Sequence, residues 1–298
     1  MEKRPEVICV GQAVVDCITR GMEEDPNGNG KVRAKSITLN LGGDAVNESF
    51  ALLEMGRSAG LVCAVGKDLA GSSILSEAAG RGVDVTGVTV SEDLVTPVAD
   101  ILVKMDGSRS SVTSAASTLP GYRPDPAALR GARAVSLASL FRAPLDSADT
   151  IRELAAAAKR EGALLFADTK IPTFRMMDLE QIADVLPLID CIFPNETEAA
   201  YFSGKHTFPE MADVFLSMGV RRVVIKAGPE GCYAACPEER FSIPALPVPV
   251  IDTTGAGDNL VAGYIHASLD GASFREACEA GIASAARSIQ HLGASRGA

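Results

Sequence analysis

Ile251-Asp252-Thr253-Thr254-Gly255-Ala256-Gly257-Asp258-Asn259 has the composition of a turn that opens a helix. Thr253 and Thr254 are residue types that begin helices well, and Gly255 and Gly257 let the backbone approach a ligand closely. The free N–H groups and the positive dipole end of the new helix favour an anion such as a phosphate. A purely structural glycine-rich helix start is the alternative interpretation.

Two acids bracket this turn, and they favour the functional interpretation. A carboxylate beside a bound phosphate repels the ligand, so Asp258 needs a chemical reason to be there. Accepting a proton from a hydroxyl group that attacks the phosphate is such a reason. The stretch therefore predicts a phosphoryl-transfer site with Asp258 as the base.

Composition limits the classes of protein to consider. The chain has 298 residues, of which 47% are hydrophobic, enough for one large α/β domain or a domain with a subdomain. The formal charge of −10 argues against a nucleic-acid partner or an anionic membrane surface. The seven cysteines contain no C-x-x-C pair and are typical of reduced thiols in a cytoplasmic protein. We also expect no signal peptide and no membrane span.

Strand and helix patterns alternate through most of the chain. This alternation predicts a mostly parallel sheet covered by helices on both faces, with ligands at the carboxyl ends of the strands. Strands are expected at 7–11, 59–65, 134–138, 163–167, 190–193, 221–226, 232–235 and 241–250, and helices at 42–55, 68–81, 147–160, 179–186, 195–202, 209–218, 255–269 and 274–291.

Two segments without helices predict a small β subdomain. Residues 13–41 contain two strand patterns, and residues 83–117 contain three, at 88–90, 98–105 and 110–115, with a hairpin turn at 106–109. We therefore expect an αβα domain of residues 1–12, 42–82 and 118–298 and a β lid of residues 13–41 and 83–117. Exposed edge strands on this lid favour a homodimer.

Four motifs in order resemble those of the ribokinase-like (PfkB) carbohydrate kinases, over essentially the whole chain. They are Gly42-Gly43-Asp44-Ala45-Val46-Asn47, Phe193-Pro194-Asn195-Glu196-Thr197-Glu198, Ile225-Lys226-Ala227-Gly228-Pro229-Glu230-Gly231 and Asp252-Thr253-Thr254-Gly255-Ala256-Gly257-Asp258. The resemblance implies an αβα sandwich with a small β lid. It also implies transfer of the γ-phosphate of ATP to a hydroxyl of a sugar, a sugar acid or a nucleoside.

The resemblance assigns roles around the first stretch. Asp258 corresponds to the catalytic base, and Gly255, Ala256 and Gly257 correspond to an anion hole of backbone N–H groups. Asp252 is similar to a residue that lies near a monovalent cation, so potassium is implied there for members that use it. The segment 293–295 would supply its other ligands.

Nucleotide and magnesium roles fall on the two middle motifs. Asn195 and Glu198 match an N-x-x-E pattern that organises Mg²⁺ largely through water, although the same pair is typical of a helix-capping box. Both roles are compatible. The nucleotide-side positions implied by the resemblance are Asn195, Lys226, Gly228, Gly231, Thr253 and Gly257.

Asp16, Gly42, Gly43 and Asn47 match the positions that bind the acceptor's hydroxyl groups, since a carboxylate and an amide suit a diol. The structural alternatives are a surface position for Asp16 and a local hydrogen bond for Asn47.

Departures from the family pattern concern the acceptor. Asp44 stands where ribokinases proper carry lysine, a form closer to 2-keto-3-deoxygluconate and some fructose kinases. Arg142 and Lys170 occupy two further positions of the acceptor site. We hypothesise that one of them meets an acidic group of the acceptor or the γ-phosphate; otherwise Lys170 pairs with Asp168 and Arg142 is solvated.

A carbohydrate kinase is therefore the leading prediction, with ATP and Mg²⁺ as cofactors. A nucleoside kinase of the same family is one alternative, and a catalytically silent nucleotide- or metabolite-binding regulator is another. A dinucleotide-binding dehydrogenase is disfavoured because Gly11 begins no G-x-G-x-x-G motif.

Overall fold

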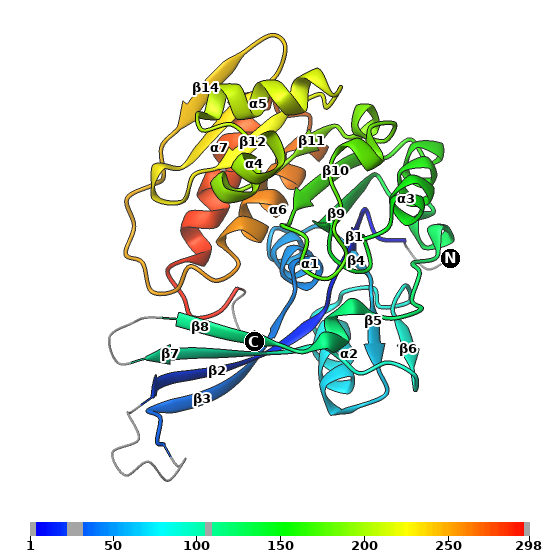
Figure 1. Cartoon of the computed structure of the whole chain (residues 1–298), viewed down its shortest axis with the longest axis vertical. Helices are drawn as coiled ribbons and strands as arrows, with labels where there is room; N and C mark the ends of the chain where they lie inside the picture. Colours follow the sequence, from blue (N-terminus) through cyan, green and yellow to red (C-terminus); the bar gives the residue numbers. More distant parts are fainter. Residues whose placement is uncertain (1–3, 23–31, 105–108, 295–298) are drawn as a thin grey trace.

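A computed structural model of the chain describes residues 4–22, 32–104 and 109–294. Its main body is one large sheet between two layers of helices (Figure 1). The strands of this sheet are β1 (Val7–Val10), β4 (Ala59–Val62), β9 (Ala134–Leu140), β10 (Leu164–Thr169), β11 (Cys191–Ile192), β12 (Val223–Lys226), β13 (Cys232–Ala235) and β14 (Arg240–Ile243). The helices are α1 (Asp44–Glu54), α2 (Leu69–Arg81), α3 (Ala148–Arg160), α4 (Glu196–Ser203), α5 (Phe208–Ser217), α6 (Ala256–Leu269) and α7 (Phe274–Ser288).

The large sheet has the strand order β14-β13-β12-β11-β10-β9-β1-β4. From β12 to β4 the strands pair in parallel, and β13 and β14 add an antiparallel edge. Parallel strands bring their carboxyl ends to one edge, where the segments that follow β9, β10, β11 and β12 meet. The predicted αβα sandwich with a mostly parallel sheet is confirmed.

Two apolar cores cover the two faces of this sheet. One contains α1, α2, α6 and α7, with Tyr264 and Phe193 among its buried aromatic residues. The other contains α3, α4 and α5, including Leu154 and Phe215. Because both faces are covered, the strands read as nearly continuous apolar runs.

The lid is a separate sheet with the order β3-β2-β7-β8, which extends from one end of the main body (Figure 1). Its strands are β2 (Val14–Met22), β3 (Ser36–Gly42), β7 (Val98–Lys104) and β8 (Arg109–Thr113). The two chain excursions predicted to form it do pair side by side, through β2 and β7. Most of the predicted hairpin turn at 106–109 lies outside the described residues.

Part of the predicted lid lies elsewhere. β6 (Thr89–Ser91) pairs in parallel with β5 (Ala64–Gly66), apart from the lid sheet. Asp68 holds the residues after β6 in place, because its carboxylate accepts a hydrogen bond from Thr96 N as well as capping α2 through Gly71 N. The segment 83–97 is thereby attached to α2.

Two other elements are shorter than expected. The helix predicted at 179–186 is a series of turns with short 3-10 helices at Glu180–Ile182 and Leu186–Leu188. The strand predicted at 241–250 ends at Ile243, because Pro244 follows it and has no N–H group for a ladder. Further 3-10 helices are Ala115–Thr118, Pro126–Leu129 and Gly228–Glu230.

Candidate active site

The start of α6 forms a cradle of backbone N–H groups. Gly255 is its N-cap, with a φ of 72° that favours glycine. A Cβ at Gly255 would lie 2.2 Å from the Cβ of Ala294, so only glycine fits beneath the C-terminal loop. The first N–H groups of a helix lack helical partners, although that of Ala256 donates here to the carbonyl oxygen of Thr253 at 3.2 Å. Nζ of Lys226 lies 3.4 Å from where a Cβ of Gly257 would be and adds a positive charge. The cradle therefore suits an anion.

Asp258 lies in the first turn of α6 and is buried, with 5% of its surface exposed. Its Oδ2 accepts a 2.7 Å hydrogen bond from Nδ2 of Asn47 in α1. Burial, with the charge of Asp44 as the next cause, raises the pKa of Asp258 to about 7, and Lys170 opposes this shift. A carboxylate with this pKa is an effective proton acceptor near neutral pH.

Asn47 has one unused polar atom. Its Oδ1 is buried and has no hydrogen-bond partner among the described residues. Buried amide oxygens are normally paired. A donor from the acceptor, such as a hydroxyl, would satisfy this oxygen, which agrees with the predicted role of Asn47.

A network of acidic and basic side chains near Asp258 connects the carboxyl ends of β9, β10 and β12. Ser139 of β9 donates to Oδ2 of Asp44 at 2.8 Å, and Lys170, after β10, lies 3.4 Å from Oδ1 of Asp44. Lys170 also lies 3.5 Å from Oδ2 of Asp168, which is fully buried. Lys226, at the end of β12, lies 2.5 Å from the other oxygen of Asp168.

This network partly neutralises the predicted acceptor-side lysine. Burial would lower the pKa of Lys170, but the charges of Asp168 and Asp44 outweigh burial and hold the pKa well above its usual value. Lys170 is therefore a charged side chain already flanked by two acids. The interpretation in which it pairs with Asp168 is the one the geometry favours.

The lid reaches the same site through Asp16 of β2. A Cβ at Gly42 would lie 2.2 Å from Oδ2 of Asp16, and a Cβ at Gly43 would lie 2.4 Å from the carbonyl oxygen of Gln12. Gly43 also has a φ of 93°. Both glycines are thus required for lid strand β2 to cross directly over the start of α1.

Asn195 and Glu198 form a complete capping box at the start of α4. Oδ1 of Asn195 accepts from Glu198 N, and Oε2 of Glu198 accepts from Asn195 N and from Oγ1 of Thr169. Burial raises the pKa of Glu198, against the charge of Lys226. A carboxylate held in this way fits a hydrated Mg²⁺, which keeps several of its waters and needs few direct protein ligands.

Gly228 and Gly231 shape the loop after β12. Both have positive φ angles, of 54° and 93°. A Cβ at Gly231 would lie 2.0 Å from the carbonyl oxygen of Ile243, so this loop packs backbone against backbone. The loop follows directly after Lys226, the last residue of β12.

Asp252 is saturated with hydrogen-bond donors. Oδ1 accepts from N and Oγ1 of Thr254, and Oδ2 accepts from Gly293 N and from Nη2 of Arg20, at 3.0 Å. Burial would raise the pKa of Asp252, but these bonds and the charge of Arg20 keep it below its usual value. A carboxylate has about four lone-pair sites. All four have donors, so this arrangement does not fit a potassium ion; Ser295, another predicted ligand, lies outside the described residues.

Arg142 lines a small cavity of about 130 Å³ at the lid side of the main body. Its Nε donates to the carbonyl oxygen of Ile171 at 2.8 Å, and it forms no ion pair within residues 4–22, 32–104 and 109–294. Gln12, Thr113 and Arg175 also line this cavity. Arg142 therefore borders a cavity, whereas Lys170 lies between two acids.

Three residues of the site were not among the predicted site residues: Ser139, Asp168 and Glu48. The buried strand that precedes Asp168 offered a signal for it, because a polar residue at the carboxyl end of a parallel strand lies at the ligand edge. Glu48 is fully buried, and burial holds its pKa well above the usual value. An apolar helix face gives no sequence signal for such a group.

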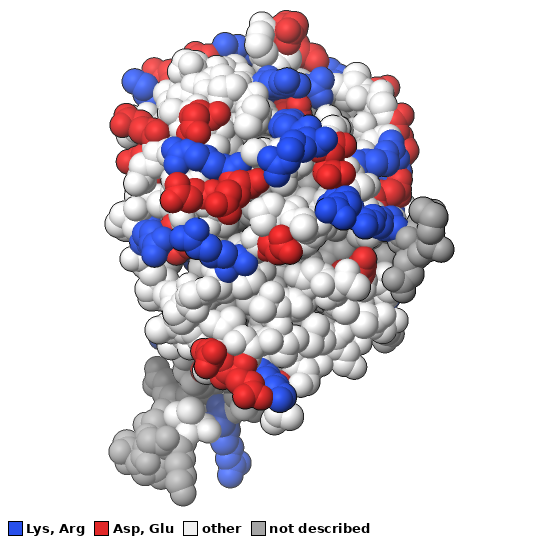
Figure 2. Space-filling view, turned by 90° about the vertical axis from the view of Figure 1, so that its right-hand side faces the viewer, with Lys and Arg blue, Asp and Glu red and all other residues white. Residues whose placement is uncertain are grey.

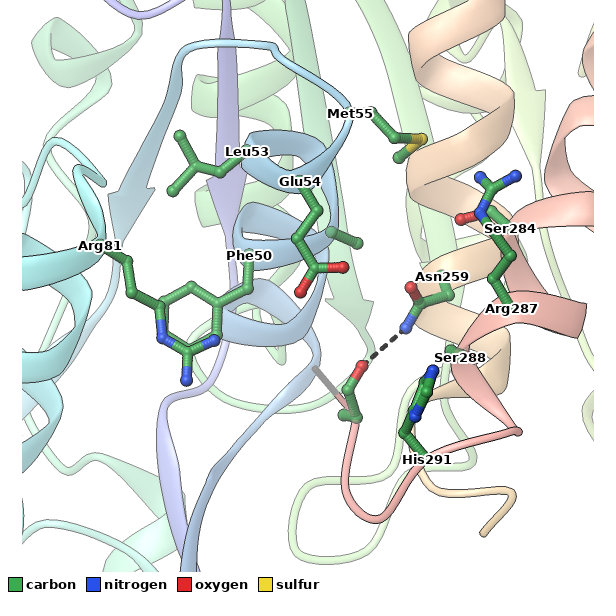
Figure 3. A pocket seen from close by; sticks show the side chains of 12 residues that line it. Phe50, Leu53, Glu54, Met55, Arg81, Asn259, Ser284, Arg287, Ser288 and His291 are labelled. Carbon is green, nitrogen blue, oxygen red and sulfur yellow. Dashed lines mark hydrogen bonds between the residues drawn. The ribbon is translucent and has the colours of Figure 1, made fainter. Parts of the chain in front are cut away.

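A second cavity, of about 600 Å³, lies between α1, α6 and α7 (Figure 3). Asn259 borders it and donates to the carbonyl oxygens of Gly255 and Ala294. Arg287 and His291 project into it from α7 and the residues after it. Ala294, which packs against Gly255 of the cradle, also lines this cavity.

The surface is mixed in charge. On the face that Figure 2 shows, Lys and Arg side chains are interspersed with Asp and Glu. Across the described residues, no helix is both long and apolar enough to cross a bilayer.

Comparisons with known proteins find similar sequences and similar folds. The profile of the pfkB family carbohydrate kinases matches residues 4–298. Ribokinase of Haemophilus influenzae is 29% identical over 258 residues, covering 85% of this chain and 82% of the relative. The 2-dehydro-3-deoxygluconokinase of Bacillus subtilis is 28% identical over 269 residues, covering 87% and 83%. The structure of Arabidopsis thaliana ribokinase complexed with ribose and ATP superimposes with a TM-score of 0.83 at 24% identity, covering 98% of this chain and 94% of the other.

Proposed function

This chain belongs to the pfkB family and is a carbohydrate kinase, and we propose that it transfers the γ-phosphoryl group of ATP to a hydroxyl of a sugar or sugar acid. The observation that carries this proposal is the buried Asp258 at the N-terminus of α6, which accepts a hydrogen bond from Asn47 of α1. A base and an anion cradle on adjacent residues are what phosphoryl transfer to an alcohol requires.

In the proposed mechanism, Asp258 accepts the proton of the hydroxyl as its oxygen attacks the γ-phosphorus. Asn47 orients the carboxylate, and its free Oδ1 accepts a hydrogen bond from the acceptor. The N–H groups of Gly255, Ala256 and Gly257, together with Lys226, stabilise charge on the transferred group.

We place the nucleotide beside the loop of Lys226, Gly228 and Gly231, with its phosphates toward Thr253 and Gly257. Asn195 and Glu198 would hold Mg²⁺ through its waters. When bound, Mg²⁺ supplies positive charge for the phosphate oxygens. The protein's own part is to hold Glu198 in the capping box, so that its carboxylate stays oriented.

For the acceptor, we propose contacts with Asp16, Asp44 and Asn47, under a closed lid formed on Gly42 and Gly43. Arg142 is the candidate partner for an acidic group at the far end of the acceptor, because Lys170 already lies between Asp44 and Asp168. This contact would favour a sugar acid over the neutral sugar of the same length.

A screen of ATP consumption against sugars, sugar acids and nucleosides tests the proposal. The Asp258→Asn variant should lose roughly 10²–10⁴-fold in turnover while still binding ATP. Nearly normal turnover in this variant would exclude Asp258 as the base. A preference for nucleosides would select the nucleoside-kinase alternative, and ATP binding without turnover on any acceptor would support a silent regulator.

Arg142→Gln tests the choice of acceptor. If Arg142 pairs with an acid, this variant should raise KM roughly tenfold or more for sugar acids and leave neutral sugars nearly unchanged. The neutral sugar is thus the internal control. An equal loss on both acceptors would remove Arg142 from this role.

We also propose a homodimer through the outer face of the lid. Ile37, Leu39 and Val112 are 66%, 70% and 65% exposed and, by strand register, share the face opposite Asp16. A second copy of this chain would cover this apolar face. Light scattering after gel filtration should give a dimer for the wild type and a monomer for Leu39→Asp. A wild type that is monomeric, like the variant, would refute this contact.

A further inference from the structure

Arg20 links the lid to the loop that precedes the anion cradle. It lies on β2, on the same face as Asp16, and its Nη2 is 3.0 Å from Oδ2 of Asp252. The side chain of Asp252 is 4% exposed and that of Arg20 is 34% exposed. The ion pair therefore has one buried member, whose charge must be balanced locally.

The same carboxylate holds three parts of the chain together. Through Thr254 it fixes the turn into Gly255, and through Gly293 N it fixes the C-terminal loop. That loop packs on Gly255 and accepts a hydrogen bond from Asn259 through the carbonyl oxygen of Ala294, as the dashed line in Figure 3 shows. The state of Asp252 thus sets the position of the cradle.

We infer that the Arg20 guanidinium is the built-in cation of Asp252, which positions the anion cradle from the lid and makes the enzyme independent of monovalent cations. Four donors fill the lone pairs of Asp252, and one of them is a full positive charge. Arg20 is a positioning residue, because it acts on the cradle through Asp252. The inference rests on the proposed kinase function for its activity readout only.

Because Arg20 lies on lid strand β2, its positive charge reaches Asp252 only when the lid is in this position. β2 carries both Asp16, at the acceptor, and Arg20, at Asp252. An acceptor that holds the lid closed through Asp16 therefore also keeps the cation at Asp252. The cradle is held in place when the acceptor is present.

Arg20→Met tests this inference, because methionine keeps an unbranched apolar chain but removes the donor and the charge. Wild-type turnover should be the same in potassium, sodium and tetramethylammonium chloride at equal ionic strength. In tetramethylammonium, Arg20→Met should fall at least about tenfold, the scale for removing one partner of a buried charge. Potassium should restore most of this loss. Arg20→Lys, which keeps a charge, should need no potassium.

Lys35→Met is the matched control, because Lys35 is an exposed cation of the lid region. It should behave as the wild type in all three salts. A second readout needs no acceptor: potassium, compared with tetramethylammonium, should raise the Tm of Arg20→Met and leave the wild type unchanged. This readout still decides the inference if the proposed kinase reaction fails.

A roughly tenfold activation of the wild type by potassium would overturn the inference. So would an Arg20→Met variant that responds to potassium in neither turnover nor Tm. If Arg20→Met does not fold, the wild type and Arg20→Lys decide: a potassium requirement in either overturns the inference, and independence in both supports it.

Discussion

Asp258→Asn should make the protein more stable at neutral pH while it destroys activity. The folded-state pKa of Asp258 is raised to about 7 from an ordinary value of 3.8. Between these values the unfolded chain has lost the proton and the folded chain retains it, so stability falls as pH rises through this window. Above pH 7 the buried carboxylate is charged and the loss is complete.

The raised pKa sets a ceiling of about 4 kcal/mol on this loss. We expect about 1–3 kcal/mol, because Lys170 and Asp44 readjust when the charge is removed. Asparagine is nearly isosteric, and its side-chain oxygen still accepts from Asn47. The substitution therefore removes the charge and keeps the hydrogen bond.

Urea unfolding of both proteins from about pH 5.5 to 8.5 measures this difference; lower pH is avoided because the isoelectric point is near 4.9. The stability of Asp258→Asn relative to the wild type should increase up to about pH 7 and then stay level. Asp93→Asn, at an exposed position, is the control and should show no such trend. A variant that is less stable than the wild type at pH 8 would refute the assignment of a strained, buried carboxylate.

Two further predictions concern activity. In the wild type, kcat/KM should rise with pH through about 7 and level above it, since only the ionised Asp258 accepts a proton; a flat profile from about pH 6 to 8 contradicts this. Asn47→Ala should lower kcat/KM by roughly 10–100-fold and move the same acid limb to higher pH. The hydrogen bond from Asn47 stabilises the ionised form of Asp258, so its removal raises the pKa of Asp258. An unmoved limb would show that Asn47 does not act on Asp258.

The sequence predicted the residues that have a local signal. The turn at Gly255 and Gly257 is visible because its spacing and its glycines are dictated by backbone geometry. The capping box of Asn195 and Glu198 is equally local. The sheet and its covering helices followed from hydrophobic periodicity, which depends on neighbours along the chain.

What the sequence could not predict depends on contacts between distant segments. The pairing of β6 with β5 is one such contact, and so is the hydrogen bond between Thr96 and Asp68, 28 residues apart. Arg20 and Asp252 are 232 residues apart, so neither reveals the other in sequence. The family resemblance implied a cation at Asp252, and the fold places the guanidinium of Arg20 there.

The charges near Asp258 also depend on contacts between distant segments. Two lysines, Lys170 and Lys226, flank the buried carboxylate of Asp168. Asp168 is fully buried between Lys170 and Lys226, so each lysine is held in place by a charge it shares. Lys226 reaches the cradle and Lys170 reaches Asp44, at opposite ends of the site. Asp168 thus fixes the proposed nucleotide side relative to the proposed acceptor side, and an in-line transfer would depend on that distance. Lys170 is then a spacer of this geometry, and Arg142 is left as the proposed partner of an acidic acceptor.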